Sequence, residues 1–195
     1  MTVKRIAMGE WAPDLPSSTG TENNNLADAK NVFPNNVGYS PFPSAEIVSP
    51  AADEDLTSVY AGKEGDLVQI FTGGEQKLYI VYSDNSPLTR RALSFDGPVV
   101  ITDAGRTSSA YAPSEEPWHF EQFGRKALAC KNNNVLQQWT IGISVNFTDI
   151  PTAPTAKCMT IVGDQVVAGN IGAGDDPNLV MWSDLNNEEN WVPGP

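Results

Sequence analysis

From Asp55 onward the chain is a succession of short runs of β-branched and aromatic residues, separated by Gly, Asn and Asp. The first group of runs is LTSVYAG, DLVQIFTG, QKLYIVYS, TRRALSF and GPVVITD, with Gly73-Gly74 and Asp96-Gly97 at turn positions. Runs of this length bounded by turn residues are typical of antiparallel strands. A content of 16 Gly and 15 Pro, with only 18 % charged residues, also favours a turn-rich β protein. The sequence therefore predicts an all-β fold built from antiparallel meanders.

Two further groups of runs share a common plan. The second contains WHFEQFG, KALACKN, VLQQWTIG and SVNFTDI, and the third contains AKCMTIVG, QVVAGNIG and LVMWSDL. In both groups a run ends at a glycine, Gly124 or Gly163, and an apolar strand, a turn and a Trp-containing strand follow. These glycines are 39 residues apart, within the range of a four-stranded propeller blade, and Gly62 or Gly65 takes their place in the first group. Residues 53–195 are thus predicted to form about three blade-like units, with a β-sandwich of evenly spaced hairpins as the alternative.

Residues 1–52 have a different composition. Six prolines and six asparagines lie between Met1 and Pro50, and they disfavour regular structure because proline lacks a backbone donor and asparagine competes for local hydrogen bonds. The segment nevertheless carries apolar anchors that a solvated linker would not need. We predict an extended N-terminal arm with one short helical turn over residues 26–30. The candidate partner-interface residues of this arm are Trp11, Phe33, Tyr39 and Phe42.

Charge and cysteine content narrow the class of protein. Lys and Arg number 12 against 24 Asp and Glu, so the formal charge of -12 argues against a dedicated nucleic-acid binder, whose affinity comes mainly from neutralising phosphates. The two cysteines, Cys130 and Cys158, are predicted to be buried free thiols in a reducing compartment. No apolar run is long enough for a signal peptide or a membrane span.

The sequence predicts no catalytic, metal or cofactor site, and therefore no enzyme. His119 is the only histidine, and we interpret it as a strand residue rather than as a general base. The cysteines form no CxxC pair, and the adjacent acids 115–116, 175–176 and 188–189 are interpreted as solvated surface. A calcium site in the loop GAGDDPN is a weaker hypothesis. Residues 146–148 match the N-glycosylation sequon, but no secretory signal accompanies it in the sequence.

Four of the five tryptophans fall at strand ends or turn corners. These are Trp118, Trp139, Trp182 and Trp191. Aromatic side chains at such corners are more often buried locks of the fold than ligand-stacking platforms. They are therefore predicted to be buried.

Several motifs resemble one family. The opening GEWAPDLP and the segment ADAKNVFPNNVGYSPFPS resemble the N-terminus of tail nozzle, or tail tubular, proteins of short-tailed, podovirus-type bacteriophages. PWHFEQFGRKALAC resembles the blade opening of that family, and NLVMWSDLNNEENWVPG resembles its WS-x-L-x5-W segment. The four motifs span Trp11 to Trp191 in the same order. Family members are usually much longer than 195 residues, so this chain would match their N-terminal portion.

The resemblance implies a virion structural protein built on β-propellers, with no catalytic residues. It would be assembled in the host cytoplasm into the phage tail, as a homohexameric ring below the portal and the head-to-tail adaptor. The ring would form part of the DNA ejection conduit, through which DNA passes without specific binding. A negative lumen would repel phosphates, in agreement with the acidic charge. The arm would then lie on a neighbouring subunit or on the adaptor.

Two other function classes stay open at this point. A binding module for host glycan or protein would use exposed residues such as Trp182 and Asp184. A glycan hydrolase would need two carboxylates about 5 to 10 Å apart in a cleft, and no pattern in the sequence marks such a pair.

Overall fold

The computed structural model describes residues 32–35, 38–41, 50–83, 98–172 and 176–191. The chain divides into two compact units, Met1–Glu46 and Ile47–Pro195. The described residues contain antiparallel strands and no helix, which confirms the predicted all-β class. The predicted strand at residues 89–95, the turn at Asp96-Gly97 and the helical turn at 26–30 lie outside the described residues.

In the first unit, β1 (Val32–Asn35) and β2 (Gly38–Pro41) pair antiparallel, with Asn35 opposite Gly38. This hairpin is regular structure in a segment whose proline and asparagine content predicts little of it. A two-stranded ribbon leaves half of its backbone N–H groups unpaired, so Pro34 and Pro41 can be accommodated without the loss of a ladder bond.

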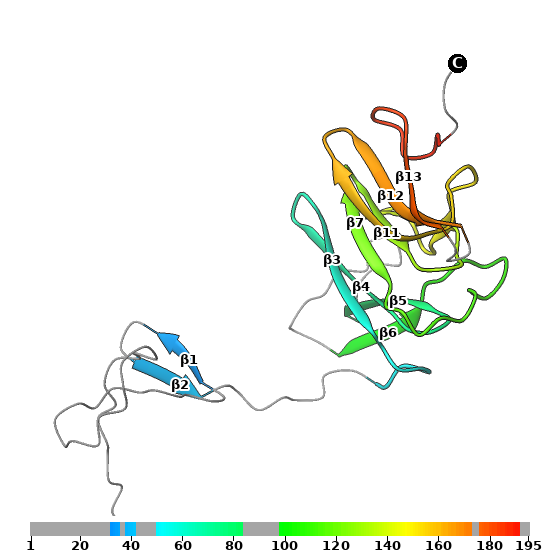
Figure 1. The fold of residues 1–195 in the computed structure, drawn as a ribbon. Helices are drawn as coiled ribbons and strands as arrows, with labels where there is room; N and C mark the ends of the chain where they lie inside the picture. The colour runs from blue at the N-terminus through cyan, green and yellow to red at the C-terminus, as the bar shows by residue number, and fades with distance from the viewer. Residues whose placement is uncertain (1–31, 36–37, 42–49, 84–97, 173–175, 192–195) are drawn as a thin grey trace, which may run out of the picture. The chain divides into compact units, whose positions relative to one another are not determined.

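The described part of the second unit contains three antiparallel sheets, each a simple meander in chain order (Figure 1). The first sheet consists of β3 (Ser58–Glu64), β4 (Leu67–Gly73), β5 (Leu78–Ser83) and β6 (Val99–Asp103). The second consists of β7 (His119–Phe123), β8 (Lys126–Cys130), β9 (Gln137–Thr140) and β10 (Thr148–Asp149). The third consists of β11 (Ala156–Val162), β12 (Gln165–Ile171) and β13 (Asp176–Trp182).

In each of these three sheets the first two strands are joined by the same kind of two-residue turn. Each turn begins with a glycine of positive φ: Gly65 at 58°, Gly124 at 57° and Gly163 at 58°. Glycine is suited to this left-handed backbone because it has no Cβ to clash with the carbonyl. Gly65, rather than Gly62, is therefore the equivalent in the first sheet.

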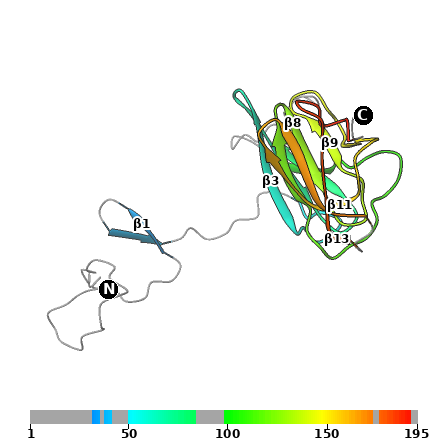
Figure 2. The same ribbon diagram turned by 45° about the horizontal axis from the view of Figure 1, so that its top comes forward.

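The first strands of the three sheets are neighbours, since β3 contacts β7 and β7 contacts β11 (Figure 1). The sheets pack face to face around two cores, and Figure 2 shows β3, β8 and β11, one from each sheet, close together. The core between the first and second sheets includes Phe71, Leu78, Ile80, Trp139 and Phe147. The core between the second and third sheets includes Leu128, Ile150, Met159, Val166 and Trp191.

The shared turn gives the three sheets the same side-chain register. Residues four and six positions after the turn glycine face the next sheet: Gln69 and Phe71 in the first sheet, Leu128 and Cys130 in the second. Residues three and five positions after it face the preceding sheet: Ala127 and Ala129 in the second sheet, Val166 and Ala168 in the third. The stack therefore has a direction. We call the face of a sheet that points toward the next sheet in chain order its forward face, and the face that points toward the preceding sheet its backward face.

Polar side chains clamp the joint between the first and second sheets. Gln122 accepts a hydrogen bond from the backbone N–H of Lys63 at 2.9 Å and donates to its carbonyl at 2.7 Å. Lys131 is fully buried and donates to the carbonyls of Gly74 and Glu75 at 3.0 and 2.7 Å. Burial lowers the pKa of Lys131, and nearby acidic side chains only partly offset this effect. Backbone groups of the first sheet and its turn thus satisfy the polar groups of Gln122 and Lys131, which hold the two sheets together.

Candidate docking surface on the third sheet

The forward face of the third sheet has no further sheet on it within the described residues. We call this surface the third-sheet face; it consists of Cys158, Thr160, Val162, Gln165, Val167, Gly169, Val180 and Trp182. The alternation of β11 and β12 turns Met159, Val166 and Ala168 inward, so their neighbours point outward. Val162 is 58 % exposed, Val180 50 % and Trp182 62 %. Contiguous apolar exposure of this kind marks an interaction surface more often than a solvated one.

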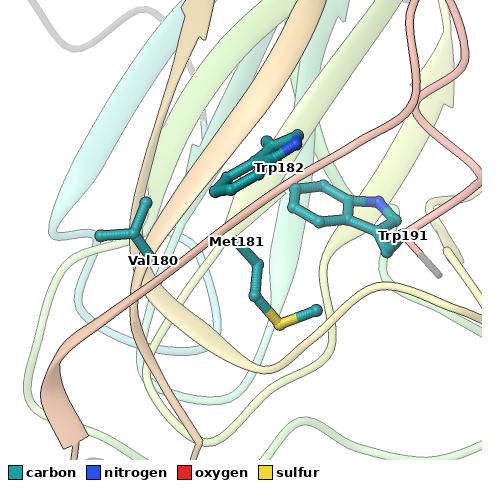
Figure 3. A pocket seen from close by; sticks show the side chains of 4 residues that line it. All are labelled: Val180, Met181, Trp182 and Trp191. Atoms are coloured by element: carbon teal, nitrogen blue, oxygen red, sulfur yellow. The ribbon is translucent and has the colours of Figure 1, made fainter. Parts of the chain in front are cut away.

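A pocket lies beside this face, lined by Val180, Met181, Trp182 and Trp191. Figure 3 shows Trp182, Trp191 and Met181 arranged around the same space. β13 is the last strand of its sheet and pairs with β12 alone among the described strands. The pocket therefore lies at a sheet edge and is lined by aromatic and aliphatic side chains.

The turn after β13 holds Trp191 in place. Trp191 is 2 % exposed, and its indole N–H donates to the carbonyl of Glu188 at 2.7 Å. Its backbone N–H donates to the Thr152 hydroxyl at 3.3 Å. The turn itself closes through a bond from the Asp184 N–H to the Asn190 carbonyl at 2.8 Å. The buried side of the pocket is thus fixed, whereas Trp182 projects from the sheet.

An ion-pair cluster ties the same turn to the second sheet. The ammonium of Lys126 pairs with Glu188 and, at 2.8 Å, with Glu189. Burial acts to lower the pKa of Lys126, but hydrogen bonds and charge from both glutamates outweigh it and raise the pKa. The hydrogen bonds from Lys126 and Gln138 lower the pKa of Glu189. The charged forms of Lys126 and Glu189 are thus favoured, which suits a structural role.

Of the four predicted corner tryptophans, three are buried as expected: Trp118, Trp139 and Trp191 are 3 %, 0 % and 2 % exposed. The prediction is wrong for Trp182. A strand sequence shows alternation but does not show whether a further layer covers a given face. Asp184, the other residue considered for ligand binding, is engaged in the turn: its carboxylate accepts from the N–H of Leu185 at 2.9 Å and from Asn190 at 3.3 Å.

The cysteines are both free, but only one is buried. Cys130 lies in β8, and burial raises the pKa of its thiol well above the ordinary value. Cys158 is exposed on the third-sheet face, so the prediction of two buried thiols is wrong for this residue. Its position five residues before Gly163 places it on the forward face of its sheet, but the sequence does not show whether another sheet covers that face.

Several residues considered for catalysis or metal binding lie in the described part of the chain. His119 is an exposed residue at the start of β7. Glu116 pairs with Lys157, and Asp176 begins β13 rather than lying in a loop. No group of three or more His, Cys, Asp or Glu side chains that could hold a metal occurs in these residues.

Other predicted positions are partly described. Residues 173–175 of the suggested calcium loop, Asp175 among them, lie outside the described residues. In the sequon, the Asn146 amide donates to the Gly105 carbonyl at 2.9 Å and Phe147 is fully buried, so this segment packs into the fold. No helix in the described ranges is long and apolar enough to cross a membrane.

The predicted arm anchors are only partly placed. Phe33 lies in β1 opposite Ser40, and Tyr39 lies in β2 opposite Pro34. Trp11 and Phe42 lie outside the described residues. Their proposed contact with a neighbouring subunit therefore stays a prediction.

No protein-family model matches the chain, and neither the curated proteins nor the solved structures contain a match to it.

Proposed function

We propose that this chain is a structural subunit of a short-tailed phage tail, in the nozzle ring below the portal and the adaptor, and not an enzyme. The observation that carries the proposal is the exposed apolar third-sheet face with Trp182 at its edge, because it is a surface for assembly. The ordered motifs from Trp11 to Trp191 direct the proposal to the tail nozzle family.

We further propose that the three sheets are consecutive blades of a β-propeller. Each is a meander in chain order, and their first strands are neighbours, which is the arrangement of blades around a channel. A closed propeller has about four to eight blades, so its completion requires further sheets. The third sheet has three described strands, and a fourth would pair with β13.

In the virion the subunits would form a homohexameric ring, with adaptor and other tail proteins as partners. Trp11, Phe33, Tyr39 and Phe42 would anchor the N-terminal arm on a neighbour. Aromatic residues are suited to this task because they contribute a large share of interface energy. The net charge of -12 suits a conduit that lets DNA pass during ejection without retaining it.

The experiment that tests the virion role is mass spectrometry of purified particles of the phage that encodes the chain. We expect peptides from residues 1–195 at a fixed ratio to the portal protein. Non-structural phage proteins from the same lysate are the control for contamination. If particles lack these peptides while the lysate contains them, the chain is not a tail component.

The arm is tested separately, by assembly onto portal–adaptor complexes. Full-length protein in which the four anchors are replaced by alanine, and a deletion of residues 1–45, should both fail to assemble. A matched variant in which Asn23, Asn24 and Asn25 are replaced by serine should assemble normally. Unimpaired assembly of the four-alanine variant would refute the arm hypothesis.

The exposure of Trp182 also favours a second candidate, a binding module for host glycan. An exposed indole can stack on a sugar ring, and the pocket beside it is largely apolar. A glycan array distinguishes the two: hits that disappear in Trp182→Ala would support the binding module, and an array without hits would exclude it.

A further inference from the structure

The third-sheet face occupies the position that is covered in the other two sheets. Four residues after the turn glycine, Gln69 and Leu128 are buried against the following sheet, whereas Val167 is half-exposed. The third strands of the first and third sheets, β5 and β13, differ more in the exposure of their forward-facing aromatic residues. Tyr82 of β5 is packed into the first joint at 9 % exposure, and Trp182, opposite Val167, is 62 % exposed. This face therefore has the form of one half of a sheet-to-sheet joint.

The other end of the stack presents the complementary half. On the backward side of the first sheet, one row of paired residues crosses all four strands: Ala61, Ile70, Val81 and Ile101. We call this the first-sheet face. Ile70 is five residues after Gly65, the position taken by Ala129 and Ala168, which fill the two existing joints. Ala61 is exposed and the other three are half-exposed.

We propose that the third-sheet face of one copy of this chain packs on the first-sheet face of a second copy. The described residues make the same forward-to-backward joint twice, so the two faces that no described sheet covers match by register and by apolar character. A second copy is the occupant that brings a backward face of this register. The contact is head-to-tail, and contacts of this type close into a ring when the rotation between copies permits it.

The first joint predicts which residues meet. There Tyr60, five residues before Gly65, stacks on Phe120, four residues before Gly124, with ring centroids 5.7 Å apart and an interplanar angle of 10°. The same offsets place Cys158, five residues before Gly163, against Ala61 of the second copy. Cys158 is a free exposed thiol, so it reports directly on this contact.

This inference shares with the proposed function the idea of identical subunits in a ring, but it rests on the sheets alone. It is tested with the purified full-length chain, without particles or adaptor. A negative result here would leave the particle test unaffected, and the reverse also holds.

The decisive experiment uses one variant for each face. Trp182→Asp and Ala61→Asp alter exposed side chains, so both should keep the native circular dichroism spectrum. Sedimentation should show wild-type protein as an assembly larger than the 21.0 kDa chain, and each variant alone as a monomer, with Kd raised about tenfold or more. A mixture of the two variants should form a heterodimer, since one intact joint remains between an unaltered third-sheet face and an unaltered first-sheet face.

Cross-linking checks the predicted register. Ala61→Cys should form a disulfide with the native Cys158 of another copy under mild oxidation, whereas Ser108→Cys, exposed on a loop, should not. Monomeric wild-type protein would overturn the proposal, because neither face would then bind a copy. An Ala61→Asp variant that still assembles by itself would also overturn it, since the contact would then join two identical faces.

Discussion

Two tryptophans of the second unit should differ sharply in how much stability is lost when each is replaced by alanine. Trp139 is fully buried between the first and second sheets, with ring centroids 5.3 Å from Phe71 and 5.2 Å from Phe147. Its indole N–H donates to the Gln69 side chain at 2.9 Å. Gln69 also accepts from the N–H of Gly142 at 3.1 Å, so removal of the indole leaves this acceptor satisfied. The cost of Trp139→Ala is therefore that of a cavity, about 3–5 kcal/mol.

For a domain of this size, about 1 kcal/mol corresponds to roughly 2–4 °C in Tm, so Trp139→Ala should lower Tm by about 6–20 °C. Trp182→Ala is the matched control, because this side chain projects from the sheet. In the monomer it should change the free energy of unfolding by about 0.5 kcal/mol or less. Urea and thermal unfolding, followed by far-UV circular dichroism at low protein concentration, measure both. Equal losses of stability in the two variants would refute the assignment of Trp139 to the core and Trp182 to a binding surface.

Further substitutions test the turns, the first joint and the charged cluster. A Cβ on Gly73 would lie 2.3 Å from Cδ1 of the buried Trp118, so Gly73→Ala should destabilise the fold by about 1–3 kcal/mol or more. The control is Gly62→Ala, whose Cβ would lie 3.0 Å from a terminal methyl of Ile141 and should cost less stability in the same urea titration. Gly163 has a φ of 58°, so Gly163→Ala should lower the free energy of unfolding by about 1–2 kcal/mol, and Gly163→Asn should lower it less because asparagine tolerates this backbone. Equal losses for the two variants in urea unfolding would contradict the role of backbone strain. The lowered pKa of Glu189 means that its carboxylate contributes stability that is complete above the ordinary value of 4.5 and is lost as the pH falls through the folded pKa. Glu189→Gln should therefore flatten the dependence of Tm on pH below about 4.5. If Tm falls equally in the variant and the wild type over this pH range, the Glu189 carboxylate makes no such contribution.

The strands and their turns were largely predictable from local sequence. The runs from LTSVYAG to LVMWSDL correspond to strands where the structure describes them, except that SVNFTDI forms only the two-residue β10. Runs of β-branched residues between turn residues favour strands without regard to distant contacts. Between β8 and β9 the chain turns at Asn133, which has a φ of 65°, a left-handed backbone that asparagine tolerates. The glycine spacing identified Gly124 and Gly163 as equivalent, since both need the same left-handed backbone.

The candidate surface was less predictable. Trp182 and Trp139 both lie in short strands, and their local sequences do not distinguish an exposed side chain from a fully buried one. The same holds for Cys158 and Cys130. Exposure depends on whether another sheet covers the face, which is a contact between residues far apart in the chain. A side chain such as Lys131, whose type predicts exposure, is buried for the same reason, because backbone carbonyls of the first sheet satisfy it.

The sequence by itself determined the all-β class, the antiparallel meanders and the glycine at each repeated turn, because these depend on residues within a few positions of one another. Only the tertiary structure decided which face of each sheet is covered, how the three sheets stack in one direction, and that Trp182 and Cys158 lie on a forward face that no described sheet covers. The physical reason is that burial is set by packing between separate sheets, whereas strand and turn formation is set by local backbone preference.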